Sequence, residues 1–145
     1  MSRKAAREVA VHIVYDYGFN NEIGEESLQH FLSDEFAESI SEDIEIYSQV
    51  GKGQHEYISA IVCGVADKRE EIDELIKKYS VGWSIKRISR IAMAIMRVAI
   101  YESKYVEDVS EKIAINEAVE IAKKYYTAET VAFINGILGS VVREG

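Results

Sequence analysis

The sequence predicts an all-α fold, a compact bundle of helices in a single domain that spans residues 1–145. Over most of the chain, apolar residues recur every three or four positions, which is the repeat of an amphipathic helix. No segment shows the alternation of a strand, and the chain contains no proline, the residue that breaks helices. Apolar residues make up 48% of the chain, which is enough for a sizeable core.

The segment Ile88–Glu102 is expected to form the central helix of this bundle. Its apolar residues form two stripes on different faces, and a helix that is apolar nearly all round is usually buried on all sides. It is far too short to cross a bilayer. Arg97 lies inside it and must be paired, because an unpaired buried charge is costly. We expect a structural ion pair, with Glu102 or Glu117 as the partner.

Five further segments have the apolar spacing of a helix. They run over Arg3–Gly18, Glu25–Ser39, a long third segment His55–Tyr79, Ile113–Tyr125, and from Thr127 onward. Ser84, Ser110 and Thr127 are placed to cap the helices that follow them, since a side-chain hydroxyl can accept a hydrogen bond from a free N–H of the first turn. Gly64, inside the third segment, would let another helix cross closely.

The charge is strongly negative overall but unevenly distributed. A formal net charge of −8 argues against a nucleic-acid partner for the chain as a whole. Acids accumulate over residues 22–45, whereas Arg3, Lys4 and Arg7 lie together at the start. A small basic patch beside an acidic region is compatible with local phosphate binding. A second basic cluster consists of Lys86, Arg87 and Arg90.

No motif indicates an enzyme, a cofactor or a metal site. His12, His30 and His55 are scattered and belong to no metal-binding or catalytic signature. The single cysteine, Cys63, cannot form an internal disulfide and is expected to be a small core residue in a reducing compartment. Without a signal peptide or an apolar run of membrane length, the chain is expected to be cytoplasmic and without a membrane partner.

Val11 and Tyr15 stand apart from the apolar face of the first helix. They are four residues apart and are therefore neighbours on its outer surface. Two interpretations remain open: the pair forms a small patch that binds a partner, or another part of this chain covers it.

The strongest clue to function is a resemblance in the C-terminal half. The segment IAINEAVEIAKKY (Ile113–Tyr125), followed by FINGILG (Phe133–Gly139), resembles the NusB family of transcription antitermination factors. The segment IMRVAIYE (Ile95–Glu102) looks like the family's preceding helix, and RKAAREVAVHIVY (Arg3–Tyr15) is similar to its arginine-rich first helix. The region 19–53 resembles nothing specific.

The resemblance implies a fold of about seven helices in two lobes. Three helices would form the N-terminal lobe, about residues 1–80, and four the C-terminal lobe, about residues 81–145. It also implies binding to the boxA segment of ribosomal and phage leader RNA, a single-stranded RNA, together with the small-subunit ribosomal protein NusE. The pair then joins the elongating RNA polymerase complex and suppresses premature termination. Some family members self-associate, so a homodimer is possible.

The family's RNA contacts match residues at both ends of this chain. Arg3, Lys4 and Arg7 match the basic residues of the first helix, and Glu129 and Phe133 match positions near the RNA in the last helix. Single-stranded RNA is commonly read by stacking on aromatic rings, a role that suits Phe133. The alternative for Phe133 is a core position at the edge of the apolar stripe.

The family's contact with the ribosomal protein matches Tyr15, and Val11 lies beside it. Ala92 stands where the family commonly has an acid that faces this partner, and Met93 replaces a common basic or polar residue. Ser110 replaces a common proline.

Two other functions fit the same resemblance. The domain resembles the N-terminal part of certain ribosomal RNA cytosine methyltransferases, so the chain could be the RNA-binding module of a truncated enzyme. It could also be a helical adaptor that has lost its RNA contacts, which the acidic charge permits.

Overall fold

The computed structural model describes residues 3–16, 55–80 and 89–144, and within these ranges all the regular structure is helical. The six described helices are α1 (Arg3–Asp16), α5 (His55–Asp67), α6 (Arg69–Tyr79), α7 (Arg90–Tyr105), α8 (Glu111–Lys123) and α9 (Ala128–Glu144). The predicted all-α class is thus confirmed. The expected helix over Glu25–Ser39 and the expected cap at Ser84 lie outside the described residues. No helix in the described part of the chain is both long and apolar enough to cross a membrane.

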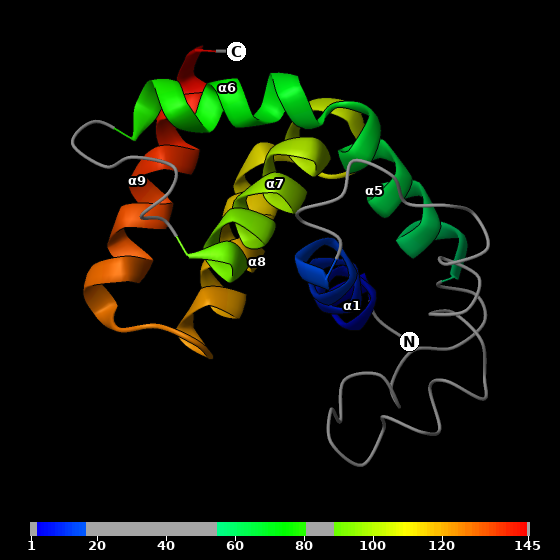
Figure 1. Ribbon diagram of the computed structural model, residues 1–145, viewed down its shortest axis with the longest axis horizontal. Coiled ribbons are helices and arrows are strands. Elements are labelled where there is room, and N and C mark those ends of the chain that lie inside the picture. The colour runs from blue at the N-terminus through cyan, green and yellow to red at the C-terminus, as the bar shows by residue number, and fades with distance from the viewer. Residues whose placement is uncertain (1–2, 17–54, 81–88, 145) are drawn as a thin grey trace.

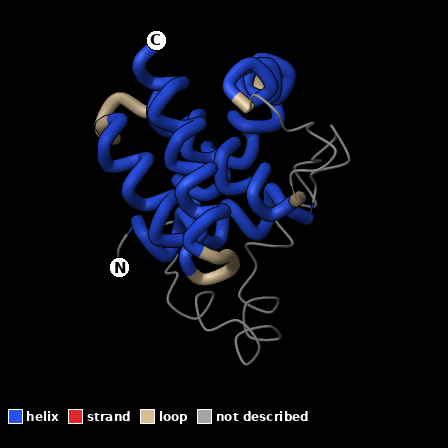
Figure 2. The backbone as a smooth tube through the Cα atoms, turned by 90° about the vertical axis from the view of Figure 1, so that its left-hand side faces the viewer, coloured by secondary structure: helices blue, strands red, loops and turns tan. Residues whose placement is uncertain are grey.

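Helix α7 is the centre of the bundle, as its sequence predicts. It packs against α1, α5, α6, α8 and α9, the five other described helices (Figure 1). Residues 92–100 of α7 are all buried, and one continuous apolar core includes residues of all six helices. In the tube view the helices are joined by short loops wherever the connection is described (Figure 2). The helix begins at Arg90 because Ser89 is its N-cap, with Oγ accepting a hydrogen bond from the Ala92 N–H at 3.3 Å.

The predicted long third helix is two helices that meet at an angle (Figure 1). The break is at Lys68, where the backbone has φ −101° and ψ 12°. The hydrogen bonds continue through it, from the Lys68 N–H to the Gly64 carbonyl and from the Ile72 N–H to the Lys68 carbonyl. The bend therefore cannot be predicted from the apolar repeat of the sequence. The bend lets α5 pack on α1 while α6 packs on α9, and both still contact α7.

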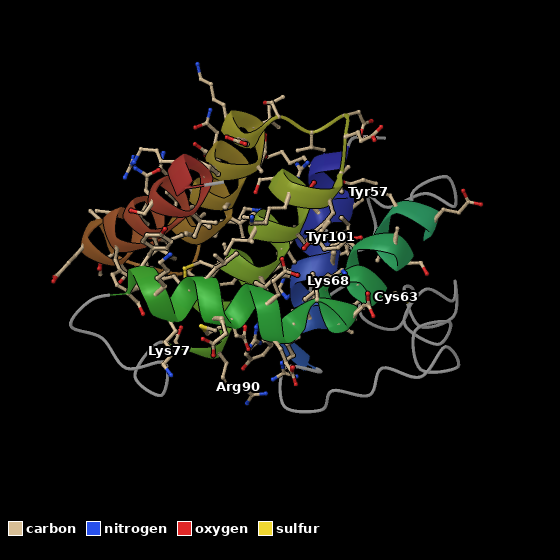
Figure 3. The ribbon with its side chains drawn as sticks, turned by 90° about the horizontal axis from the view of Figure 1, so that it is seen from above. Tyr57, Cys63, Lys68, Lys77, Arg90 and Tyr101 are labelled. Atoms are coloured by element: carbon tan, nitrogen blue, oxygen red, sulfur yellow. The ribbon has the colours of Figure 1, made fainter. Side chains whose placement is uncertain are left out.

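Two smaller predictions have opposite outcomes. Ser110 caps α8 as expected, with its Oγ accepting a hydrogen bond from the Ile113 N–H at 3.1 Å. The prediction that Cys63 is a core residue is wrong, because its side chain is exposed on α5 (Figure 3). Val62 and Val65 turn inward on either side of it, and the helical repeat of about 100° per residue carries Cys63 to the outer face.

Gly64 allows the close crossing that the sequence predicts, because the ring of Tyr101 on α7 lies where a Cβ of Gly64 would be. We expect Gly64→Ala to lower the free energy of unfolding by about 1–3 kcal/mol through overpacking. Without the contact to Tyr101, replacing Gly by Ala inside a helix would raise the free energy of unfolding by roughly 1 kcal/mol. The sign of the measured change in this free energy therefore tests the contact. The measurement is urea unfolding, with Gly136→Ala as the matched control. A Cβ at Gly136 would meet nothing within 4 Å, so this variant should be neutral or more stable.

Candidate functional site

Helix α1 is attached to the centre of the bundle by a buried ion pair. The Arg7 Nε donates to Glu102 Oε1 at 2.5 Å and Nη2 donates to Oε2 at 2.8 Å. The Tyr57 hydroxyl also donates to Glu102 Oε2, from α5. Arg7 is 5% exposed and Glu102 is fully buried. Burial opposes the charge on Arg7, but the hydrogen bond and charge of Glu102 outweigh it, so the pKa of Arg7 is raised.

This pair corrects the predicted role of Arg7 as an RNA contact. A guanidinium that is buried and bound through two nitrogens to an internal carboxylate is not available to a phosphate on the surface. Lys4, one turn earlier, is exposed. Arg3 begins α1, and its side chain lies outside the described part of the structure. Among the three predicted basic contacts, Lys4 is therefore the one that the structure shows at the surface.

Arg97 is buried and paired, as predicted, but its partner is Asp73 of α6. The two nitrogens Nε and Nη2 donate to the two Asp73 carboxylate oxygens at 2.8 and 2.9 Å. Glu102 is taken by Arg7, and Glu117 Oε2 lies 4.0 Å from Arg7 Nη1. The expectation of Glu102 or Glu117 as the Arg97 partner is therefore wrong. The bend between α5 and α6 brings Asp73 onto α7, and no periodicity reveals it.

A second polar cluster joins α1 to the end of α8. Glu8 is buried and accepts a hydrogen bond from Lys124 Nζ at 2.5 Å. The Tyr125 hydroxyl shares a hydrogen bond with His12 Nε2 at 3.0 Å, and His12 Nε2 lies 4.0 Å from Glu8 Oε2. These contacts join residues more than a hundred positions apart and have no signal in the sequence. The spacing of Glu120 suits a pair with Lys124, but Glu120 instead pairs with Lys123.

The start of α7 meets the end of α1 and the turn after α8. The Arg90 guanidinium lies 4.9 Å from the centre of the Tyr15 ring, a cation–π distance, and Nη2 donates to the Tyr15 carbonyl oxygen at 3.5 Å. The Tyr126 hydroxyl is hydrogen-bonded to Oγ of Ser89, the cap of α7. This region lies away from Tyr57 and Tyr101 in the view of Figure 3, where Arg90 is labelled. Tyr15 itself is half-buried, so part of its ring remains at the surface.

The structure buries three of the four residues predicted to contact the ribosomal protein. Val11, Ala92 and Met93 are all less than 5% exposed and belong to the core where α1 packs on α7. The second interpretation of Val11, that the chain itself covers it, is thus the right one. Ala92 and Met93 therefore do not present a surface to a partner. Tyr15 is the predicted contact residue that retains exposure.

Glu129 and Phe133 lie in the first turns of α9. Glu129 is exposed. Phe133 is half-buried and packs against the core, so the core interpretation holds in part. Part of the side chain remains exposed, and stacking on RNA stays a prediction. The start of α9 follows Thr127, whose carbonyl accepts a hydrogen bond from the Val131 N–H.

The described residues thus form an all-helical bundle, with side chains such as Lys4 and Tyr125 exposed near the ends of its helices. The NusB family model matches residues 4–143. The transcription antitermination protein NusB of Acetivibrio thermocellus is 42% identical over 143 residues, which cover 99% of this chain and 90% of that protein.

Solved structures agree with this match. The structure of NusB from T. maritima superimposes with a TM-score of 0.80 at 27% identity, covering 99% of this chain and 92% of that one. A chain from a complex of the antitermination factors NusB and NusE with double-stranded RNA has a TM-score of 0.75. It is 23% identical, covers 99% and 97% of the two chains, and shows the shared fold.

This chain belongs to the NusB family. It is a transcription antitermination factor rather than an enzyme, as the resemblance implies.

Proposed function

We propose that this chain binds boxA-like single-stranded RNA together with the ribosomal protein NusE, and that the assembly joins the elongating RNA polymerase complex in the cytoplasm to support ribosomal RNA transcription. The observation that carries this proposal is the family match over residues 4–143. A structural relative of the same fold was solved with NusE and double-stranded RNA, which supports NusE and RNA as classes of partner. The exposed Lys4 and Glu129 and the partly exposed Phe133 provide the RNA surface, and Tyr15 the protein surface.

Affinity for RNA in this assembly depends on few cations. The net charge is −8, and the buried pair with Glu102 removes Arg7 from the phosphate contacts. Because phosphate contacts supply most of the affinity for nucleic acid, we expect weak binding by the isolated protein and tight binding with the ribosomal partner.

Lys4 and Phe133 should give different signatures in one salt titration. Lys4→Ala should weaken binding to all single-stranded RNAs alike and flatten the salt slope by roughly 0.7 for one lost phosphate contact. Phe133→Ala should weaken binding by about 1–3 kcal/mol with the slope unchanged, if a base stacks on the ring. The measurement is fluorescence anisotropy of a labelled boxA-like RNA at several salt concentrations, with the ribosomal protein present. An unchanged slope in Lys4→Ala would mean that the phosphates lie elsewhere.

Tyr15 should anchor the ribosomal protein. Replacing it by Asp should weaken that complex by at least about 2 kcal/mol, because truncating a central aromatic anchor commonly costs this much. Co-purification and calorimetric titration measure the loss. Tyr105→Asp is the matched control, since Tyr105 is also partly exposed but lies at the other end of α7. If Tyr15→Asp still co-purifies with the partner, the interface is on another face.

A further inference from the structure

We propose that Tyr125 is a second stacking surface for a base of the bound RNA, with Lys123 and Lys124 beside the neighbouring phosphates. This inference rests on the RNA binding proposed above and adds residues to it. It starts from an open aromatic ring, since Tyr125, in the turn just after α8, is 40% exposed.

The ring of Tyr125 is held in place by its edge. Its hydroxyl is hydrogen-bonded to His12 Nε2 at 3.0 Å, and the two rings meet in a T-shaped contact at 74° with centroids 6.1 Å apart. Such a contact uses at most one face of Tyr125. The neighbouring hydrogen bond between Tyr126 and Ser89 fixes the turn that follows. A ring held in this way loses little conformational freedom when a base stacks on its open face.

The charge next to the ring favours RNA over a protein as the occupant. The side chains of Lys123 and Lys124 are 59% and 50% exposed, and each ammonium group is oriented by one carboxylate, of Glu120 and Glu8 respectively. An ammonium that donates to one carboxylate keeps two N–H donors. Proteins commonly bind single strands with cations that contact the phosphates and with aromatic rings that stack on the bases. Two adjacent cations beside an open aromatic ring offer both kinds of contact. The phenol also stays neutral beside them, because burial and the charge of Glu8 raise the pKa of Tyr125.

The position of this patch fits a continuous path. Tyr125 lies four residues before Glu129, at the start of the predicted RNA surface on α9. Its partner His12 lies three residues before Tyr15 on α1, and residues at this spacing are neighbours on a helix. The patch therefore joins α1, which carries Tyr15, to the turn that leads into α9, which carries Glu129. An RNA strand held by both proteins would pass over it.

The test uses the full chain with the ribosomal protein and a boxA-like RNA in which adenines are replaced one at a time by 2-aminopurine, whose fluorescence falls on stacking. Tyr125→Ala should raise Kd by about five- to a hundredfold and restore the fluorescence of one base, with an unchanged salt slope. Tyr125→Phe keeps the ring and should bind within about twofold of wild type. Lys123→Gln should flatten the salt slope by roughly 0.7.

Tyr105→Ala is the matched control. Like Tyr125, Tyr105 is well exposed, at 37%, its hydroxyl makes a hydrogen bond, to Glu71 at 2.8 Å, and a lysine, Lys68, lies over its ring. Tyr105 differs in its position, because it lies at the far end of α7. It should leave RNA binding unchanged. Photocrosslinking of wild-type protein to 4-thiouridine RNA gives a readout that needs no variant, and the crosslink should map to the peptide that holds Tyr125.

Three results would overturn the inference. They are wild-type RNA affinity in Tyr125→Ala, a loss of ribosomal-protein binding without a loss of RNA binding, and crosslinks that map only to other peptides. If wild-type protein with its partner bound no RNA at all, the proposed function itself would fail, which the wild-type titration reveals separately.

Discussion

Replacing Arg7 by Ala is expected to lower the free energy of unfolding by about 3–5 kcal/mol, the usual cost of breaking a buried pair by removing one partner. The variant would leave the fully buried Glu102 carboxylate with the Tyr57 hydroxyl as its remaining partner. For a chain of this size each kcal/mol corresponds to roughly 2–4 °C, so the melting temperature should fall by roughly 6–20 °C. Urea unfolding and a thermal melt measure the two quantities.

A double variant separates the lost pair from lost packing. In Arg7→Met with Glu102→Gln the buried carboxylate is neutralised together with its partner, and the amide oxygen of Gln can still accept the hydrogen bond from Tyr57. The nearby carboxylate that remains is Glu117, whose Oε2 lies 4.0 Å from Arg7 Nη1 and whose side chain is 27% exposed. Replacing a buried pair by neutral groups of similar volume is often close to neutral, so most of the stability should return. Lys4→Ala, at an exposed site on the same helix, should change stability by no more than about 0.5 kcal/mol. If the single and the double variant are equally unstable, the ion pair is not what fixes α1 to α7.

The second large effect is expected at Arg97. Its two hydrogen bonds to Asp73 join α7 to α6, and Arg97→Ala should cost about 1.5–3 kcal/mol, the range for hydrogen bonds that involve charged groups. The cost should be smaller than at Arg7, because Asp73 is partly exposed and Arg69 Nε lies 3.8 Å away from it. Arg69→Ala is the control and should cost less than about 1 kcal/mol, as a more exposed pair does. If urea unfolding gives the same free energy of unfolding for Arg97→Ala as for the wild type, this account is contradicted.

The main features of the fold could be predicted because they depend on local pattern. The apolar repeat and the absence of proline predict the helices, and the two apolar stripes of Ile88–Glu102 predict that this segment is central. The bend at Lys68 could not be predicted, since the hydrogen-bonding pattern and the apolar repeat both continue through it.

The candidate site was harder to predict because burial and pairing are tertiary properties. The need of Arg97 for a carboxylate follows from burial alone, but which carboxylate it finds depends on the bend that brings Asp73 onto α7. Arg7 looks like a surface cation in the sequence, and only the packing of α1 against α5 and α7 encloses it with Glu102. The contacts of Glu8 with Lys124 and of His12 with Tyr125 join distant parts of the chain and have no sequence signal.

The most direct test of the central claim is the affinity of the wild-type protein for a boxA-like single-stranded RNA, measured with and without the ribosomal protein NusE. We expect weak binding by the isolated protein, as its net charge of −8 implies, and a large gain in affinity when the partner is added. The same RNA with a scrambled sequence should show a much smaller gain. No binding in the presence of the partner, or equal binding of both RNAs, would contradict the claim that this chain is the RNA-binding antitermination factor proposed here.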